Sequence, residues 1–89
     1  MFRMWGKLFK DNHMLRDMVA INDDPTLNRT RKVFSSLEEI CLSFDLSQPI
    51  WLDSTVKDFQ RHARARFTQD AFIESVEFDY LEIHVIEED

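Results

Sequence analysis

The last part of the chain alternates between apolar and polar residues with a period of two. The apolar members are Val76, Phe78 and Tyr80 and then, one position out of phase, Leu81, Ile83 and Val85. Such a run, rich in β-branched and aromatic residues and free of Gly and Pro, predicts a half-buried β-strand over 76–86. A shift of one residue exchanges the two faces of a strand. The change of phase therefore predicts either a β-bulge near Tyr80, which we favour, or a central strand with both faces partly covered.

Residues 1–22 fit two different structures. As strands, residues 2–9 and 14–21 flank residues 10–13, where an Asp-Asn pair favours a short hairpin loop. The competing prediction is an amphipathic helix, which would carry its basic residues on one face and could lie on a membrane surface. We favour the hairpin, because the polar residues of 10–13 would interrupt the helical stripe and because a lone C-terminal strand needs sheet partners.

The middle of the chain predicts a first helix that ends near Phe44. The run Asp23-Asp24-Pro25-Thr26 is typical of a helix start, with an acidic cap and Pro in the first turn. Apolar residues then recur at spacings of three and four: Leu27, Val33, Phe34, Leu37, Ile40, Cys41 and Phe44. The basic residues of 29–32 lie near the positive end of this helix dipole, which is mildly unfavourable and is consistent with partners elsewhere.

A second helix is predicted after Pro49, with Asp53 or Ser54 as its cap. Its apolar stripe is Val56, Phe59, Ala63 and Phe67. Thr68 then resembles the cap of a short turn over 69–74, which would place Phe72 and Ile73 against the core. Together these elements predict one compact α+β domain over 1–89. A small antiparallel sheet, made of the N-terminal hairpin and the C-terminal strand, carries two helices packed on one face.

Composition narrows the class of protein. The 89 residues fit one domain, and 44% apolar with 31% charged residues is typical of a globular chain. The single cysteine, Cys41, excludes an internal disulfide and fits a reducing compartment. No run approaches the roughly 18–20 apolar residues that cross a bilayer. Arg3, Lys7 and Lys10 interrupt the hydrophobic residues near the start, so we expect no signal peptide and a cytoplasmic protein.

Charge is unevenly distributed along a chain whose net charge is −6. Residues 57–66 hold four bases and one acid, whereas residues 67–89 hold eight acids and no Lys or Arg. On a helix, Lys57, Arg61 and Arg64 would share one face and could bind phosphate or carboxylates. Alternatively, these bases pair with acids of the last quarter of the same chain. Nucleic acid is not expected as a partner, because the acidic chain would repel it.

Trp51 completes the predicted partner-binding set. It follows Pro49 and predicts either a pocket wall or an ordinary aromatic of the core or its rim. The partner-binding residues that we predict are Lys57, Arg61, Arg64 and Trp51.

Catalytic and metal-binding signatures are sparse in this sequence. There is no Gly-rich phosphate loop, no nucleophile elbow, no Cys pair and no His pair at zinc-binding spacing. We therefore expect no enzyme, no metal and no cofactor. The alternative is a small enzyme or metal-dependent factor that uses His62 or His84 with Asp79 or Glu82.

Residues 44–53, 67–74 and 78–83 resemble a family of short acidic bacterial proteins without an assigned function. The resemblance spans most of the chain, and it implies no activity, ligand or functional residue. With catalytic motifs missing and charge patches present, we predict a small cytoplasmic protein-interaction or adaptor module. Its partner would be another protein or a second copy, and neither nucleic acid nor a membrane is expected to bind.

Overall fold

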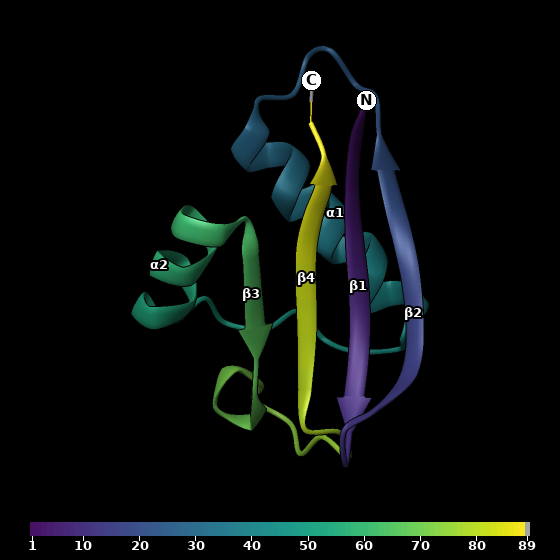
Figure 1. Ribbon diagram of the computed structural model, residues 1–89, viewed down its shortest axis with the longest axis vertical. Helices are drawn as coiled ribbons and strands as arrows, with labels where there is room; N and C mark the ends of the chain where they lie inside the picture. The colour runs from purple at the N-terminus through teal and green to yellow at the C-terminus, as the bar shows by residue number, and fades with distance from the viewer. Residues whose placement is uncertain (89) are drawn as a thin grey trace.

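The structure is a computed structural model that describes residues 1–88. Its elements are β1 (Phe2–Lys10), β2 (His13–Asn22), α1 (Arg29–Ser43), α2 (Asp53–His62), β3 (Arg64–Phe67), the 3-10 helix η1 (Gln69–Ala71) and β4 (Tyr80–Glu87). The four strands form one antiparallel sheet in the order β2-β1-β4-β3 (Figure 1). The predicted α+β class, the N-terminal hairpin and the C-terminal strand are confirmed.

The hairpin of β1 and β2 closes on a two-residue loop, Asp11-Asn12. Both residues have positive φ, 52° and 64°, as tight hairpin turns with a right-handed strand twist require. Asp and Asn tolerate this conformation better than most residues. The alternative of one helix over residues 1–22 is therefore wrong. The β1–β2 register shifts between Leu8 and Phe9, so Leu15 forms a bulge in β2.

The C-terminal strand begins at Tyr80, four residues later than predicted. Pairing with β1 continues without a break through Tyr80 and Leu81, so the predicted bulge at this point is wrong. The change of phase in the apolar pattern near Tyr80 instead marks the place where the loop ends and β4 begins. The register shift of β4 lies near its other end, between the partners of Arg3 and Met4. β4 is a central strand, and both Glu82 and Ile83 are buried, which agrees with the second alternative.

Helix α1 begins at Arg29, several residues after the predicted start. Its N-cap is Asn28, whose Oδ1 accepts a hydrogen bond of 2.9 Å from the N–H of Arg31. Asp24 instead holds a turn, in which its Oδ1 accepts bonds from the N–H and the hydroxyl of Thr26. Asp24 and Pro25 thus stabilise the connection before the helix, because an Asp side chain can bond its own backbone two residues on.

The second predicted helix divides into α2 and the strand β3. α2 ends at His62, and Ala63 follows in the left-handed conformation with φ 52°. Residues 64–67 then pair with β4, which places Phe67 in the sheet and not on the helix. The predicted caps Asp53 and Ser54 lie inside α2, whose N-cap is Leu52 without a side-chain bond. The helical face predicted to include Arg64 is therefore wrong.

After β3, the chain makes only one short turn, η1, with Thr68 at its N-cap position but no side-chain bond. Phe72 is buried as predicted, at 6% exposed, whereas Ile73 is 93% exposed and does not contact the core as expected.

The core lies between one face of the sheet and the two helices (Figure 1). α1 packs across β1 and β2, and α2 packs against β3 near the other edge. Every second residue of β1, from Phe2 to Leu8, points into this core. Leu37, Ile40 and Cys41 of α1 meet them. Among residues 1–88, both helices lie on this one side, and the opposite face of the sheet carries none of them (Figure 1).

Candidate functional site

The face of the sheet opposite to the helices lies outside the core, and we call it the open face. By strand alternation and register it consists of Arg3, Trp5, Lys7 and Phe9 of β1, Met14, Asp17, Val19 and Ile21 of β2, Arg64 and Arg66 of β3, and Tyr80, Glu82 and His84 of β4. No described helix or loop crosses it in Figure 1.

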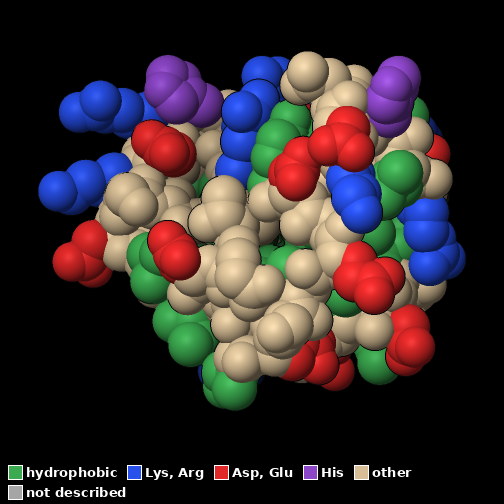
Figure 2. Space-filling view, turned by 90° about the horizontal axis from the view of Figure 1, so that it is seen from below, with side chains coloured by type: hydrophobic (Ala, Val, Ile, Leu, Met, Phe, Trp, Pro, Cys, Tyr) green, Lys and Arg blue, Asp and Glu red, His purple; other side chains and the backbone are tan. Residues whose placement is uncertain are grey.

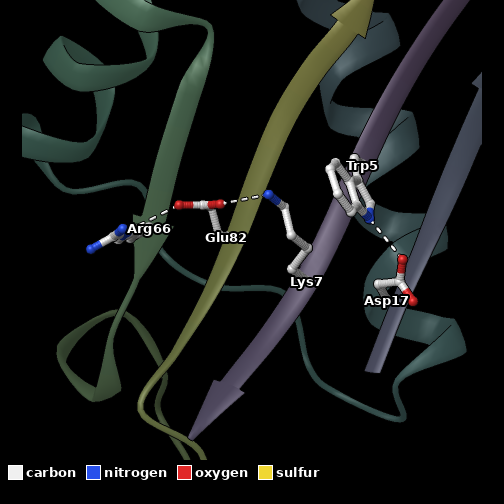
Figure 3. A network of polar contacts seen from close by, with 5 residues as sticks. All are labelled: Trp5, Lys7, Asp17, Arg66 and Glu82. Atoms are coloured by element: carbon white, nitrogen blue, oxygen red, sulfur yellow. Dashed lines mark hydrogen bonds and ion pairs between the residues drawn. The ribbon is translucent and has the colours of Figure 1, made fainter. Parts of the chain in front are cut away.

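A row of alternating charge crosses all four strands of the open face. Arg66 of β3 is paired with Glu82 of β4, Glu82 with Lys7 of β1, and Lys7 with Asp17 of β2. The Nε of Arg66 lies 3.1 Å from Glu82 Oε1, and the Nζ of Lys7 lies 3.0 Å from Glu82 Oε2. Figure 3 shows the side chains of Arg66 and Lys7 extended over the sheet toward Glu82. Cross-strand pairs of opposite charge stabilise a sheet.

Glu82 is the buried member of this row, with 4% of its surface exposed. Burial by itself would raise the pKa of the Glu82 carboxyl, because it penalises the charged form. Hydrogen bonds from Lys7 and Arg66, together with their positive charges, outweigh burial and hold the pKa below its ordinary value. The side chain is therefore an ionised carboxylate with two fixed cationic partners. Each of its oxygens already accepts one bond.

Aromatic rings flank both cations of the row. The Nζ of Lys7 lies 3.9 Å from the ring centroid of Trp5, and the guanidinium of Arg66 lies 4.5 Å from that of Tyr80. Trp5 also donates a 2.9 Å hydrogen bond from Nε1 to Asp17 Oδ2 (Figure 3). Both cationic partners of Glu82 therefore also lie against an aromatic ring of the open face.

His84 lies in the next row of the open face, between Arg64 of β3 and Trp5 of β1. Partial burial, followed by the charges of Arg64 and Lys7, lowers the pKa of His84, and the charge of Glu82 opposes this shift. The imidazole is therefore neutral at pH 7.

The predicted basic residues occupy two different surfaces. Lys57 and Arg61 lie one turn apart on α2, as predicted, whereas Arg64 lies on β3 and belongs to the open face. Of the bases in residues 57–66, Arg66 alone pairs with an acid of the last quarter, Glu82, as the alternative predicted, within the described residues. Within residues 1–88, Lys57, Arg61 and Arg64 form no ion pair.

Trp51, the fourth predicted residue, lies in the connection before α2. Its ring makes edge-on contacts with Phe34, Phe59 and Phe67, at centroid distances of 6.0, 5.5 and 5.0 Å. It also lines a cavity of about 280 Å³ between α1 and α2. Trp51 therefore fits both predictions, because its ring packs on the core and also forms a wall of the pocket.

Arg29 connects the rim of this cavity to the end of the sheet. Its guanidinium lies over the ring of Phe59, and its Nε lies 2.6 Å from Oε1 of Glu88. A carboxylate from the end of the chain thus meets the basic first turn of α1. This contact places a negative charge beside the basic residues at the start of that helix.

The residues of the enzyme or metal alternative are only partly brought together. Glu82 and His84 share the open face, but His62 ends α2, and Asp79 accepts a 2.8 Å bond from the N–H of Asp11 in the hairpin loop. Among residues 1–88, no three His, Cys, Asp or Glu side chains form a group that could hold a metal ion. Cys41 is buried, and burial raises the pKa of its thiol to about 11.

Sequence reasoning did not single out Trp5, Lys7 or Asp17. The alternation of Arg3, Trp5 and Lys7 along the first strand was a signal for an outward face. Their partners on β4 and β2, however, depend on the order of strands.

Surface charge and the comparisons add context to this site. Figure 2, which views the end with the β1–β2 turn, shows Lys and Arg side chains mainly in its upper half, whereas acidic and hydrophobic side chains occur in both halves. No helix among residues 1–88 is long and apolar enough to cross a membrane.

Comparison with known proteins finds no matching family model, curated protein or solved structure. The resemblance to short acidic bacterial proteins therefore stays a prediction.

Proposed function

We propose that this chain is a small protein-interaction module and that the open face of its sheet is the contact surface. The observation that carries the proposal is the composition of this face. Ordered charges, Arg66, Glu82, Lys7 and Asp17, cross its centre. Exposed apolar residues of β2 border them, and no described segment covers either group.

Each part of the open face supplies one property of an interface. Apolar side chains that remain exposed, such as Val19 at 40% and Ile21 at 51%, gain free energy when a partner removes them from water. Trp5 and Tyr80 are half-buried aromatics of the type that is enriched in contact surfaces. The fixed charges favour a partner of complementary pattern and disfavour others.

Arg64 provides the sharpest test, because it lies on the open face and forms no ion pair within residues 1–88. The tagged protein would be used as bait in an extract of cells that express it. Arg64→Glu is expected to reduce the captured partner about tenfold, which corresponds to about 1.4 kcal/mol.

Arg61→Glu is the matched control, since it makes the same charge change on α2 and away from the sheet. It is expected to leave capture unchanged. Equal losses in the two variants would assign the contact to net charge or to α2 and would contradict the proposal. Failure of the wild-type bait to capture any partner would contradict it as well.

A further inference from the structure

The two edges of the sheet differ in how they are protected. β3 has four residues, and two of them are Arg. Its short length and its charge both discourage the addition of another strand. β2 has ten residues and pairs only with β1 within the described chain. An edge strand presents unpaired N–H and C=O groups, for which another strand is the natural complement.

Exposed apolar residues are concentrated on this second edge. Of the twelve large hydrophobic side chains that are exposed in the described chain, four belong to β2: Met14, Leu15, Val19 and Ile21. The bulge at Leu15 interrupts the edge near the hairpin loop. The regular part that remains, Arg16 to Asn22, has no Pro, no Lys and a formal charge of zero. It therefore lacks most of the features that prevent edge pairing.

We propose that the partner on this edge is a second copy of the chain, whose residues 16–22 pair antiparallel with the same residues of the first copy. This inference rests on the proposed interaction function and assigns one of its partners. Two identical strands that pair in this way are related by a two-fold axis, so the contact closes as a dimer. The zero local charge matters, because the whole chain is acidic and two copies would otherwise repel.

The charges of β2 select the register of the pair. In each register, one residue lies at the two-fold axis and opposes its own copy. With Asp17 at the axis, the two Asp17 carboxylates oppose each other. With Ala20 at the axis, Asp17 opposes Asp23 of the second copy. Alignment on Met18 would carry the bulge at Leu15 into the ladder. Alignment on Val19 avoids all three problems. It opposes Asp17 to Ile21, Met18 to Ala20, and Val19 to itself.

This register joins the open faces of the two copies. Val19 is the cross-strand neighbour of Trp5 on β1. The dimer therefore carries a continuous row in which the two Val19 side chains lie between the two Trp5 side chains, across one extended sheet. The apolar border of the open face becomes its centre.

The oligomeric state in solution tests whether the partner of the β2 edge is a second copy of the chain. Sedimentation equilibrium over a concentration series up to the sub-millimolar range should show a monomer–dimer equilibrium. Val19→Lys should shift this equilibrium at least tenfold toward monomer, since in this register it opposes two Lys side chains to each other on the edge. Ile73→Lys is the matched control: Ile73 is 93% exposed and lies in the loop before β4, away from β2, so dimerisation should be unchanged.

A monomeric wild type over this range would overturn the second copy as partner. It would leave the function test with Arg64→Glu unaffected, because Arg64 lies on β3, at the other edge of the sheet from β2. Equal effects of the two Lys variants would overturn the placement of the contact on β2. Circular dichroism of each variant would establish that both are folded.

Crosslinking tests the register. Opposed residues of an antiparallel pair have Cα atoms about 4.5–5.5 Å apart, which suits a disulfide. Val19→Cys should therefore form a covalent dimer under mild oxidation. Ile21→Cys should form several-fold less, because its copies are offset by about 13 Å along the strands. Equal yields would overturn alignment on Val19. The native Cys41 is buried and does not compete.

Discussion

Gly6 of β1 and Ile40 of α1 are in direct contact, and only a glycine fits at this point of the strand. A Cβ atom built on Gly6 would lie 2.5 Å from Cγ2 and 2.9 Å from Cδ1 of Ile40. Both residues are fully enclosed by the core. The single glycine of the chain thus sets how closely α1 approaches the sheet, and with it the separation of the two layers.

Gly6→Ala is expected to destabilise the protein by about 1–3 kcal/mol, the range for overpacking a core. Chemical denaturation would measure the free energy of unfolding. The double variant Gly6→Ala with Ile40→Ala should cost less than the sum of the two single variants, because truncation at position 40 makes room for the new methyl group. Additive costs would contradict the contact.

Glu82→Gln should lower the free energy of unfolding at pH 7 by about 1.5–3 kcal/mol, the range for hydrogen bonds to a charged group. The pKa of Glu82 in the folded protein lies below its ordinary value of 4.5. The carboxylate therefore stabilises the fold above pH 4.5, and this contribution is lost as the pH falls through the folded-state pKa.

Urea denaturation of wild type and Glu82→Gln at several pH values would show the two stabilities converging below pH 4.5. Glu38→Gln, at an exposed position of α1, is the matched control for the change from Glu to Gln itself. A constant difference for Glu82→Gln would contradict the ionised row.

Arg64→Gln should raise the pKa of His84, because the positive charge of Arg64 is one cause of its lowered value, after burial. An NMR titration of the His84 ring proton would measure the shift. Arg61→Gln removes an equal charge from α2 and should leave this titration unchanged. Glu82→Gln should shift it in the opposite direction. Identical titrations in the two Arg variants would show that Arg64 does not face His84.

Asn28→Ala should destabilise the protein by about 0.5–2 kcal/mol, because it removes the side-chain bond to the N–H of Arg31. Asn28→Asp should retain the bond and the stability, since both residues are favoured N-caps. Thermal denaturation would compare the two. A loss of the same size in Asn28→Asp would contradict a capping role.

Local patterns in the sequence were sufficient where one short segment decides the structure. Asp11-Asn12 predicted the hairpin loop, because these residues adopt positive φ at low cost. The stripe of α1 predicted most of its buried face: Val33, Leu37 and Ile40 are in the core, whereas Phe34 is 48% exposed. The start of α1 was misplaced, because Asp24 and Asn28 are both favoured capping residues, and only the fold of the preceding turn decides between them.

β3 could not be predicted with the same means. Arg64-Ala65-Arg66-Phe67 continues the helical spacing of α2 and also alternates with a period of two. The choice is made by β4, whose free edge offers Leu81 to His84 as partners for these residues. A four-residue strand is stabilised by its neighbour and by burial of Phe67, and neither contribution is a property of the segment itself.

By itself, the sequence determined the hairpin, the amphipathic face of α1, the extended C-terminus and therefore the α+β class. The tertiary structure decided the strand order, and with it the open face and the contacts of Lys7 and Arg66 with Glu82. The physical reason is that side chains on neighbouring strands interact only when the register opposes them. That register depends on how the whole apolar set packs against the helices, because a slip of one residue would exchange the buried and exposed faces of a strand.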